Sequence, residues 1–352
     1  MRVLLVSAAY PPDRCGVGDY SRHLARRLAG RGPVTAAVLT AARDVDEEAA
    51  GPRIFHSAGN VVRTFDVWRA ARSFGPDLVH IQSPTQRPLS RLLAFCTRRL
   101  LGLAVVQTAH EHIERVDWTD RLNFPALRGL VYVRHDLRQR MPEEARSLLS
   151  GAHLEFIANG RTIPAIVLTD EERQAARAEL GAAAPLVAFF GFANPNKGVH
   201  RLFEIADPSR HHLLLLCDLD SNNEYQRRIA DLARSDLWRR RVTVAGFAPP
   251  ERVGRWLAAA DAVVFPFPGG IGPWHTSVNA AIASGSLVVA TTGDAGQFGY
   301  HADRNLYLAP AGDTAALRAG LLQHLGARRA PDASDDWDGI SQAHERFYER
   351  VR

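Results

Sequence analysis

The sequence has few cysteines and no long apolar segment. Its three cysteines, Cys15, Cys96 and Cys217, are widely spaced and form no CxxC pair, which argues against a disulfide framework and against a zinc site. No apolar run approaches the ~20 residues that a membrane-spanning helix needs. The apolar start at 1–6 is too short for a signal peptide and predicts a first strand. A cytoplasmic protein is therefore expected.

Lysine is almost absent. The chain has 43 Lys and Arg residues, and Lys197 is the single lysine. Because arginine has replaced lysine almost everywhere, position 197 is a candidate for a site that needs a compact ammonium group. The net charge is +5, and the excess of positive charge falls in residues 1–160. This excess fits an anionic ligand or surface, or simply a solvated basic face.

What is present indicates an α/β protein. The chain has 352 residues, 46% of them hydrophobic and 23% charged, as expected for a globular protein with two domains. Short apolar runs alternate with amphipathic stretches, which predicts βαβ units and parallel sheets. Strands are expected at 2–8, 34–39, 77–82, 103–108, 129–133, 153–157, 186–191, 212–217, 242–245, 262–266 and 286–291. Helices are expected at 17–30, 61–73, 87–101, 137–149, 170–180, 198–206, 222–236, 250–259, 275–284, 313–327 and 337–351.

The strand and helix pattern is repeated on either side of a polar stretch at 159–184. We expect a Rossmann-like N-terminal domain over 1–160, a Rossmann-like C-terminal domain over 161–336, and a terminal helix from residue 337. In doubly wound folds the ligand binds at the carboxyl ends of the strands. A cleft between the two sheets is therefore the expected site.

Two strand-to-helix loops contain glycine. In the first, Gly16 and Gly18 let the backbone approach a ligand, and a helix N-terminus favours phosphate. This loop lacks the third glycine of a dinucleotide fingerprint, and a plain turn is the alternative. In the second, Asn194 and Lys197 precede a helix, where an ammonium group suits a diphosphate leaving group. An exposed turn lysine is the alternative.

A third glycine-rich segment, at 265–277, ends in hydroxyl side chains. Gly270 with Thr276 and Ser277 at a helix start would form a nest for an anion. Alternatively, one hydroxyl simply caps the helix. His275 is interpreted first as a neighbour of that cap.

Histidines follow the expected strand at 103–108, at the edge where function concentrates in parallel sheets. His110 is placed to hydrogen-bond a ligand hydroxyl. As metal ligands, His110 and His112 lack a further ligand cluster in the sequence. Asp218 and Asp220 resemble a metal-binding acid pair, but a strand end followed by helix capping explains them. No metal is therefore expected.

Taken together, these segments resemble the GT-B glycosyltransferases, and specifically the large retaining group called family 4. The likeness covers nearly the whole chain in order and spacing. It is carried by the glycine loop leading to GDYSRHLARRL, then PDLVHIQ, VVQTAH, FFGFANPNKG, and VTVAGFAPPERVGRWLAAADAVVFPF before AAIASGSLVVATT. The fold that it implies is two Rossmann-like domains facing a cleft, with the terminal helix 337–352 crossing back onto the first domain.

The resemblance also implies roles for residues. Gly16 matches a glycine near the donor diphosphate, His110 a histidine near the transferred sugar, and Lys197 a lysine on the diphosphate. His110 and Lys197 are therefore the expected catalytic residues, and the nucleotide base would lie at Gly246 and Phe247. Further diphosphate contacts are expected from Gly18, Gly270, Thr276 and Ser277, and sugar or acceptor contacts from Asp19, Glu111, Asn194 and His275.

Three positions depart from the family pattern. The family usually has an arginine five residues before the lysine, and Phe192 stands there. It also usually has two glutamates eight residues apart, and Gly272 and Ala280 stand there. Those glutamates normally hold the sugar hydroxyls and the ribose, so the family pattern does not predict the donor. We expect Thr276, Ser277 and the glycine backbone to replace part of that binding.

The family likeness implies sugar transfer with retention, from a UDP- or GDP-sugar to a small-molecule, glycan or lipid-linked hydroxyl acceptor. It implies no metal, no other cofactor and no nucleic acid. The alternatives are a catalytically impaired binding protein and an enzyme like a nucleotide-sugar epimerase. The segment 87–101 mixes cations with large apolar residues, so peripheral membrane attachment is an alternative to the core-packed helix that we favour. The sequence does not predict the oligomeric state.

Overall fold

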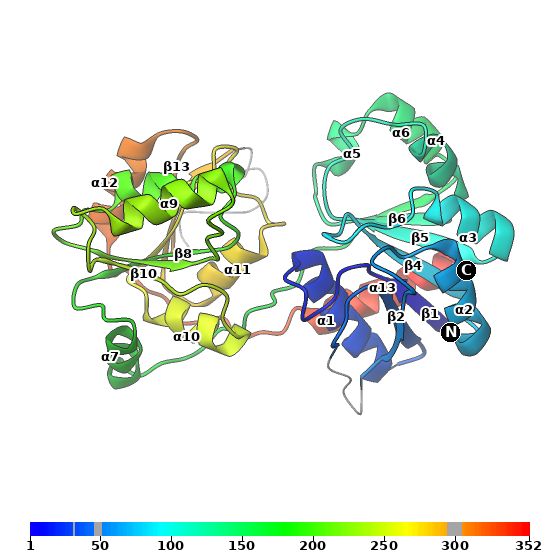
Figure 1. Cartoon of the computed structure of the whole chain (residues 1–352), viewed down its shortest axis with the longest axis horizontal. Helices are drawn as coiled ribbons and strands as arrows, with labels where there is room; N and C mark the ends of the chain where they lie inside the picture. The colour runs from blue at the N-terminus through cyan, green and yellow to red at the C-terminus, as the bar shows by residue number, and fades with distance from the viewer. Residues whose placement is uncertain (31, 46–50, 294–304) are drawn as a thin grey trace. The chain divides into compact units, whose positions relative to one another are not determined.

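The computed structural model describes residues 1–30, 32–45, 51–293 and 305–352. The chain divides into two compact units (Figure 1). Unit 1 comprises Met1–Gly160 and Asp335–Arg352, and unit 2 comprises Arg161–Ser334. The chain therefore returns to unit 1 at Asp335, shortly before its last helix begins.

Unit 1 contains a seven-stranded parallel sheet in the order β3-β2-β1-β4-β5-β6-β7. The strand order reverses between β1 and β4. Loops leave these two strands in opposite directions, and this opens a crevice at the carboxyl edge, the switch point of the sheet. The strands are β1 (Arg2–Val6), β2 (Thr35–Thr40), β3 (Arg53–His56), β4 (Leu78–Ser83), β5 (Ala104–Ala109), β6 (Gly129–Tyr132) and β7 (His153–Phe156).

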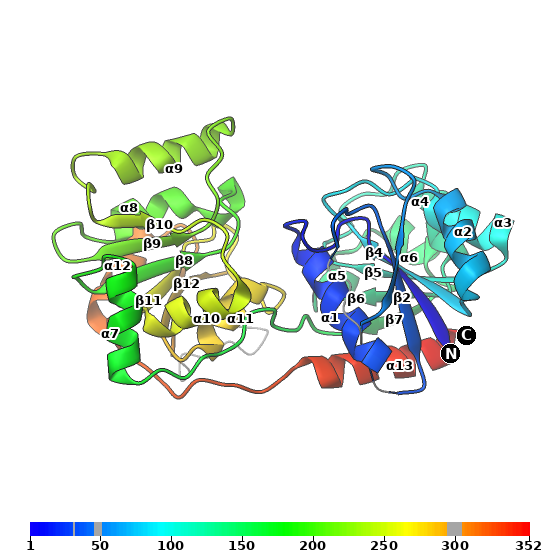
Figure 2. The same cartoon turned by 60° about the horizontal axis from the view of Figure 1, so that its bottom comes forward.

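Helices cover both faces of this sheet. On one face α1 (Gly16–Gly30) and the last helix, α13 (Trp337–Val351), contact each other (Figure 2). Both are amphipathic: α1 buries Leu24 and Leu28, four residues apart, and α13 buries Phe347 and Tyr348 in the same core cluster. The other face carries α2 (Thr64–Phe74), α3 (Leu93–Leu101), α4 (Asp120–Asn123), the 3-10 helix η1 (Phe124–Ala126), α5 (Leu137–Arg140) and α6 (Glu143–Leu148).

Unit 2 contains a six-stranded parallel sheet in the order β10-β9-β8-β11-β12-β13, with its switch point between β8 and β11. The strands are β8 (Leu186–Phe190), β9 (His212–Leu216), β10 (Val242–Val244), β11 (Ala262–Phe265), β12 (Leu287–Thr292) and β13 (Leu306–Pro310). The helices are α7 (Asp170–Glu179), η2 (Pro195–Lys197), η3 (Val199–Arg201), α8 (Leu202–Ile205), α9 (Glu224–Arg234), α10 (Pro250–Ala259), α11 (Thr276–Ala283) and α12 (Thr314–His324).

The predicted fold class, α/β with two doubly wound parallel sheets, is confirmed. Three predicted helices differ clearly from the structure. The stretch 198–206 is divided into the 3-10 helix η3 and α8. The stretch 137–149 is broken at Met141 and Pro142 into α5 and α6, because proline disfavours the helical conformation of the residue before it. The predicted helix 87–101 begins only at Leu93, since Leu89 forms a β-bridge with Val62.

The segment 87–101, which mixes cations with large apolar residues, contains a helix, α3, that packs on the core. Within α3, Leu93, Ala94 and Thr97 are buried, and the first two belong to the core cluster under this face of the sheet. Among the helices that the structure describes, none has both the length and the hydropathy required to cross a membrane.

Candidate functional site

At the switch point of unit 1, the loop after β1 leads into α1. Gly16 begins this helix and is exposed, with nothing within 4 Å of the position that a Cβ would occupy. The first N–H groups of a helix have no partner within the helix, so this end can bind a phosphate. Gly18 is buried, and a Cβ there would lie 3.0 Å from the Ala9 carbonyl oxygen. Gly16 therefore fits a phosphate contact, whereas Gly18 lets α1 pack closely on the loop.

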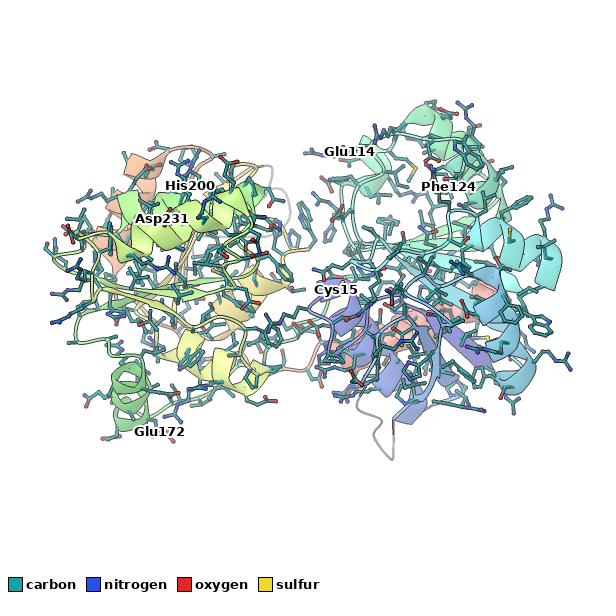
Figure 3. The ribbon with its side chains drawn as sticks, viewed as in Figure 1. Cys15, Glu114, Phe124, Glu172, His200 and Asp231 are labelled. Atoms are coloured by element: carbon teal, nitrogen blue, oxygen red, sulfur yellow. The ribbon has the colours of Figure 1, made fainter. Side chains whose placement is uncertain are left out.

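An ion pair joins the loops on the two sides of this switch point. Arg87, in the segment after β4, donates from Nη2 to Asp13 Oδ1 at 2.7 Å, and its Nε contacts the other oxygen of the same carboxylate. Cys15, labelled in Figure 3, is the last residue of the loop before α1 and is buried. No local pattern in the sequence indicates this pair, because its members are 74 residues apart.

His110 lies directly after β5, and its backbone N–H donates to the Ser83 carbonyl at 3.0 Å. Its side chain is held from two directions: Nε2 lies 2.9 Å from Gln82 Oε1, and the edge of the Tyr20 ring packs with its centroid 4.9 Å from the imidazole centroid. Burial, with a smaller contribution from His344, lowers the pKa of His110 to about 3. The imidazole is therefore neutral at physiological pH and can accept a hydrogen bond.

Two acidic candidates accompany these residues in unit 1. Asp19, in the first turn of α1, has its pKa raised to about 6 by burial, against the opposing effect of Arg22. Glu111, next to His110, is exposed. Asp19 is therefore a carboxyl group whose pKa is raised toward neutral pH by its surroundings.

In unit 2 the loops after β8 and β11 contact each other at the switch point. Lys197 ends η2, and its Nζ lies 4.1 Å from the centroid of the Phe267 ring, a cation–π distance. Gly198 has a left-handed φ of 61°, and a Cβ there would collide with the Pro266 carbonyl oxygen. Glycine is thus required beside the lysine for the two loops to meet.

The start of α11 adds hydroxyl groups to this end of the sheet. The N-cap residue is His275, without a side-chain cap bond, and its Nδ1 accepts the Gly272 N–H at 2.9 Å. Within the described residues, the hydroxyls of Thr276 and Ser277 make no hydrogen bond, so neither caps the helix and both can face a ligand. A Cβ on Gly191 would lie 3.7 Å from Ser277 Oγ, which places the serine next to the loop that carries the lysine.

Other glycines in these loops have packing roles. Gly270 has a φ of 76°, and a Cβ on it would collide with Gly293. At Gly272, where the resemblance to family 4 leads us to expect a glutamate, a Cβ would collide with the Trp274 indole. The space of the first missing glutamate is therefore taken by Trp274. Ala280, at the second of these positions, is buried in α11.

The predicted base region lies at the end of β9 and β10. Phe247 donates its backbone N–H to Asp218 Oδ1 at 2.9 Å, and its ring is 61% exposed. Gly246 has a φ of 66°, and a Cβ there would lie 3.2 Å from the same oxygen. Asp218 therefore fixes this turn and presents the Phe247 ring for stacking. Phe192 and Asn194 are also exposed in the neighbouring loop.

The described residues contain no group of three or more His, Cys, Asp or Glu side chains that could hold a metal ion. His112 Nε2 lies 3.3 Å from Asp136 Oδ2. Asp218 binds the Phe247 backbone, and Asp220 Oδ1 accepts the N–H of Asn222 at 2.9 Å. The independence from metal remains a prediction.

Each unit thus gathers its own set of candidate residues at its switch point. Unit 1 contributes Gly16, Asp19 and His110, and unit 2 contributes Lys197, Ser277 and their neighbours. The roles of Gln82, Asp218 and Trp274 were not predicted from the sequence. Gln82 and Asp218 act through contacts between distant segments, and Trp274 through its packing against Gly272. Gln82 had one signal: with His80 it forms a polar i, i+2 pair in an apolar strand.

Comparison with known proteins finds two family models, one on each unit. The model described as Glycosyltransferase Family 4 matches residues 15–160, and the model described as Glycosyl transferases group 1 matches residues 184–326. Comparison with curated protein sequences finds no match.

Solved structures share the fold over the full length. Sucrose-phosphate synthase from Thermosynechococcus elongatus has a TM-score of 0.72 and 16% identity, over 100% of this chain and 99% of that chain. Anabaena HepE in complex with UDP has a TM-score of 0.68 and 16% identity, over 100% and 99%. The catalytic domain of starch synthase IV from Arabidopsis thaliana, bound to ADP and acarbose, has a TM-score of 0.68 and 14% identity, over 100% and 99%.

The two family models fall on consecutive parts of one chain and together span most of it. The fold agrees with that of the solved structures over the full length of the chain. The protein belongs to the glycosyltransferases of GT-B fold, in the group that includes family 4.

Proposed function

We propose that the enzyme transfers a sugar from a UDP- or GDP-sugar to a hydroxyl-bearing acceptor, with retention of configuration and without a metal ion. The observation that carries this proposal is the loop pair of unit 2. There the single lysine of the chain and the unbonded hydroxyl of Ser277 stand beside a glycine-lined turn at the switch point. This set suits a diphosphate.

In the proposed reaction the donor binds to unit 2, with its base on the Phe247 ring and its diphosphate at Lys197 and the start of α11. As the bond to the anomeric carbon breaks, negative charge grows on the leaving phosphate. The ammonium of Lys197 and the N–H groups of the helix start stabilise that charge. Removing one such contact typically costs ~2.7–4 kcal/mol of transition-state stabilisation.

Unit 1 would supply the acceptor side and one contact to the transferred sugar. A neutral His110 can accept a hydrogen bond from a sugar hydroxyl, and Gly16 at the start of α1 can approach a phosphate oxygen. The leaving phosphate takes the acceptor proton in the retaining mechanism of the family, so no strong protein base is required.

The acceptor is proposed to be a small molecule, a glycan or a lipid-linked sugar, and the site of action the cytoplasm. The three cysteines are free, two of them buried, which suits a reducing compartment. No observation on the molecule favours nucleic acid as a partner.

A binding protein without catalysis is the second candidate, and one observation favours it. Trp274 fills the place of a family glutamate that holds the sugar, so a donor that needs that carboxylate has lost a contact. The epimerase-like alternative has no such observation in its favour.

A thermal-shift panel of nucleotide sugars, followed by transfer assays with the binders, tests the proposal. A ligand that binds only the folded state raises the melting temperature with its occupancy. We expect one class of nucleotide diphosphate sugar to stabilise the protein and to be turned over. Stabilisation without turnover of donor, with or without acceptors, favours the binding protein. Absence of stabilisation by any diphosphate contradicts the donor site itself.

A further inference from the structure

A row of buried polar side chains runs under the C-terminal helix and ends at His110. His80 and Gln82, two apart on β4, point to the same face of the sheet, and Thr108 lies beside them on β5, where Gln82 pairs with Thr108 in the register. All three are fully buried. Buried polar groups that are fully bonded to each other rigidify and specify a unique packing of the core.

The orientation of the Gln82 amide in the structure assigns the tautomers of both histidines. The amide oxygen can only accept, and it lies 2.9 Å from His110 Nε2, so that nitrogen carries the proton. The amide nitrogen can only donate, and it lies 3.1 Å from His80 Nε2. His80 Nε2 therefore carries the lone pair that accepts this bond. Thr108 Oγ1, 2.7 Å from His80 Nε2, can donate to the same nitrogen. One amide thus forces opposite tautomers on its two neighbours.

The far end of the row is anchored on α13. With its proton on Nδ1, His80 donates to the Tyr348 hydroxyl at 2.7 Å. His344, one turn earlier on α13, bonds the Tyr20 hydroxyl at 3.2 Å, and Tyr20 packs its ring edge on His110. The C-terminal helix therefore holds His110 both through the amide and through Tyr20.

The free end of the row is Nδ1 of His110. In the described part of the chain this nitrogen makes no hydrogen bond, and His110 as a residue is half-buried. With the proton fixed on Nε2, Nδ1 presents a lone pair and cannot donate. His110 Nδ1 therefore favours a ligand hydroxyl that donates a hydrogen bond to it.

We propose that Gln82 is a positioning residue that holds His110 as the Nε2–H tautomer, so that Nδ1 accepts a hydrogen bond from a hydroxyl of the bound sugar. His80 and Tyr348 keep the amide from rotating. The identity of the hydroxyl rests on the proposed function, whereas the tautomer does not.

Nitrogen-15 NMR of the full chain with labelled histidine tests the tautomer directly, because protonated and unprotonated ring nitrogens have well-separated shifts. Signals are assigned from their loss in His80→Gln and His110→Gln. We expect a protonated Nε2 and an unprotonated Nδ1 at His110, and the reverse at His80. Protonated Nδ1 at His110, or equal tautomers at the two histidines, would overturn the proposal.

The near-isosteric variant Gln82→Met removes the amide but keeps its volume. We expect the His110 tautomers to mix and kcat/KM to fall about fivefold, the usual worth of one neutral hydrogen bond. The matched control is Gln107→Met, on β5 next to Thr108 but on the opposite face of the strand, which should change neither. Tyr348→Phe removes the acceptor of the His80 Nδ1 proton. In this variant we expect both tautomers of His80 to be populated.

A positioning role is separated from a structural one by repeating Gln82→Met in a His110→Ala background. The variant should then have no further effect on kcat/KM or on donor affinity, and an undiminished loss would show that Gln82 acts elsewhere. If the protein transfers no sugar, the proposed function fails, while the NMR result still decides the tautomer.

Discussion

At the scale of single residues, position 197 shows why one lysine survives among so many arginines. Its Nζ lies 4.1 Å from the Phe267 ring centroid, in a turn where Gly198 must be left-handed. An ammonium is compact and can contact both a ring and a phosphate, whereas a guanidinium needs a planar space for its fork. The sequence predicted the residue, and the structure adds the ring against which it lies.

Phe247→Ala tests the base contact. The ring is exposed, so its loss should leave folding unchanged, but it should remove stacking on the nucleotide base, which is worth about 1–3 kcal/mol per base. We expect weaker binding of the donor nucleotide in calorimetric titration, with pyrophosphate binding unchanged. Phe192→Ala, also an exposed phenylalanine of unit 2, is the comparison. Equal loss for pyrophosphate would show that Phe247 does not face the base.

Gly198→Ala tests the turn that presents Lys197. A left-handed φ of 61° and a collision with the Pro266 carbonyl should lower the free energy of unfolding by about 1–3 kcal/mol. Urea unfolding measures this loss. The control is Gly339→Ala in α13, where the new Cβ meets nothing within 4 Å and the better helix propensity of alanine should raise stability. An unchanged Gly198→Ala variant would mean that the turn relaxes freely.

At the scale of secondary structure, the apolar alternation predicted most strands and helices because period and burial agree in a doubly wound fold. The strands β3 and β13 were missed. In β3 the residues are exposed or half-buried, and β13 ends at Pro310, so neither shows the continuous apolar run of a central strand. The network of His80, Gln82 and Tyr348 could not be predicted, because it joins residues 268 apart.

The helix α13 is predicted to be essential for the stability of unit 1. Phe347 is fully buried, and a Cβ on Gly129 would lie 2.6 Å from its ring. Phe347→Ala should therefore destabilise unit 1 by about 3–5 kcal/mol. Phe65→Ala, at a residue that is 60% exposed, should change stability by less than about 0.5 kcal/mol. Denaturant unfolding with hydrogen exchange in unit 1 checks both, and equal effects of the two variants would refute this role of α13.

At the scale of the whole molecule, histidines with strongly lowered pKa values make stability depend on pH. Burial lowers the pKa of His80 well below its usual 6.5, that of His110 to about 3, and those of His23 and His344 to about 4. In the unfolded chain they titrate near 6.5, so below that pH the unfolded state binds more protons. Their contribution is complete above about pH 6.5 and is lost as the pH falls toward about 4.

These four histidines, which have the largest shifts, belong to unit 1. Burial also lowers the pKa of His200, His211 and His212 in unit 2, but by less, so we expect unit 1 to lose stability first on acidification. Each neutral histidine should steepen the dependence by about 1.4 kcal/mol per pH unit in that window. Urea midpoints at pH 7.5, 6 and 5 measure the slope, and His23→Gln should make it shallower. A slope that does not change in His23→Gln would contradict a neutral His23 in the folded state.

The role of Lys197 in stabilising the diphosphate is the claim on which the proposed mechanism depends, and its kinetics test that claim most directly. With the donor found by thermal shift, kcat is compared for the wild type, Lys197→Ala and the control Arg239→Ala, an exposed cation that lies before β10, away from the carboxyl edge of the sheet. We predict a loss of about 100- to 1000-fold in Lys197→Ala, with the fold intact and Arg239→Ala unaffected. Wild-type turnover by a folded Lys197→Ala variant would contradict the account.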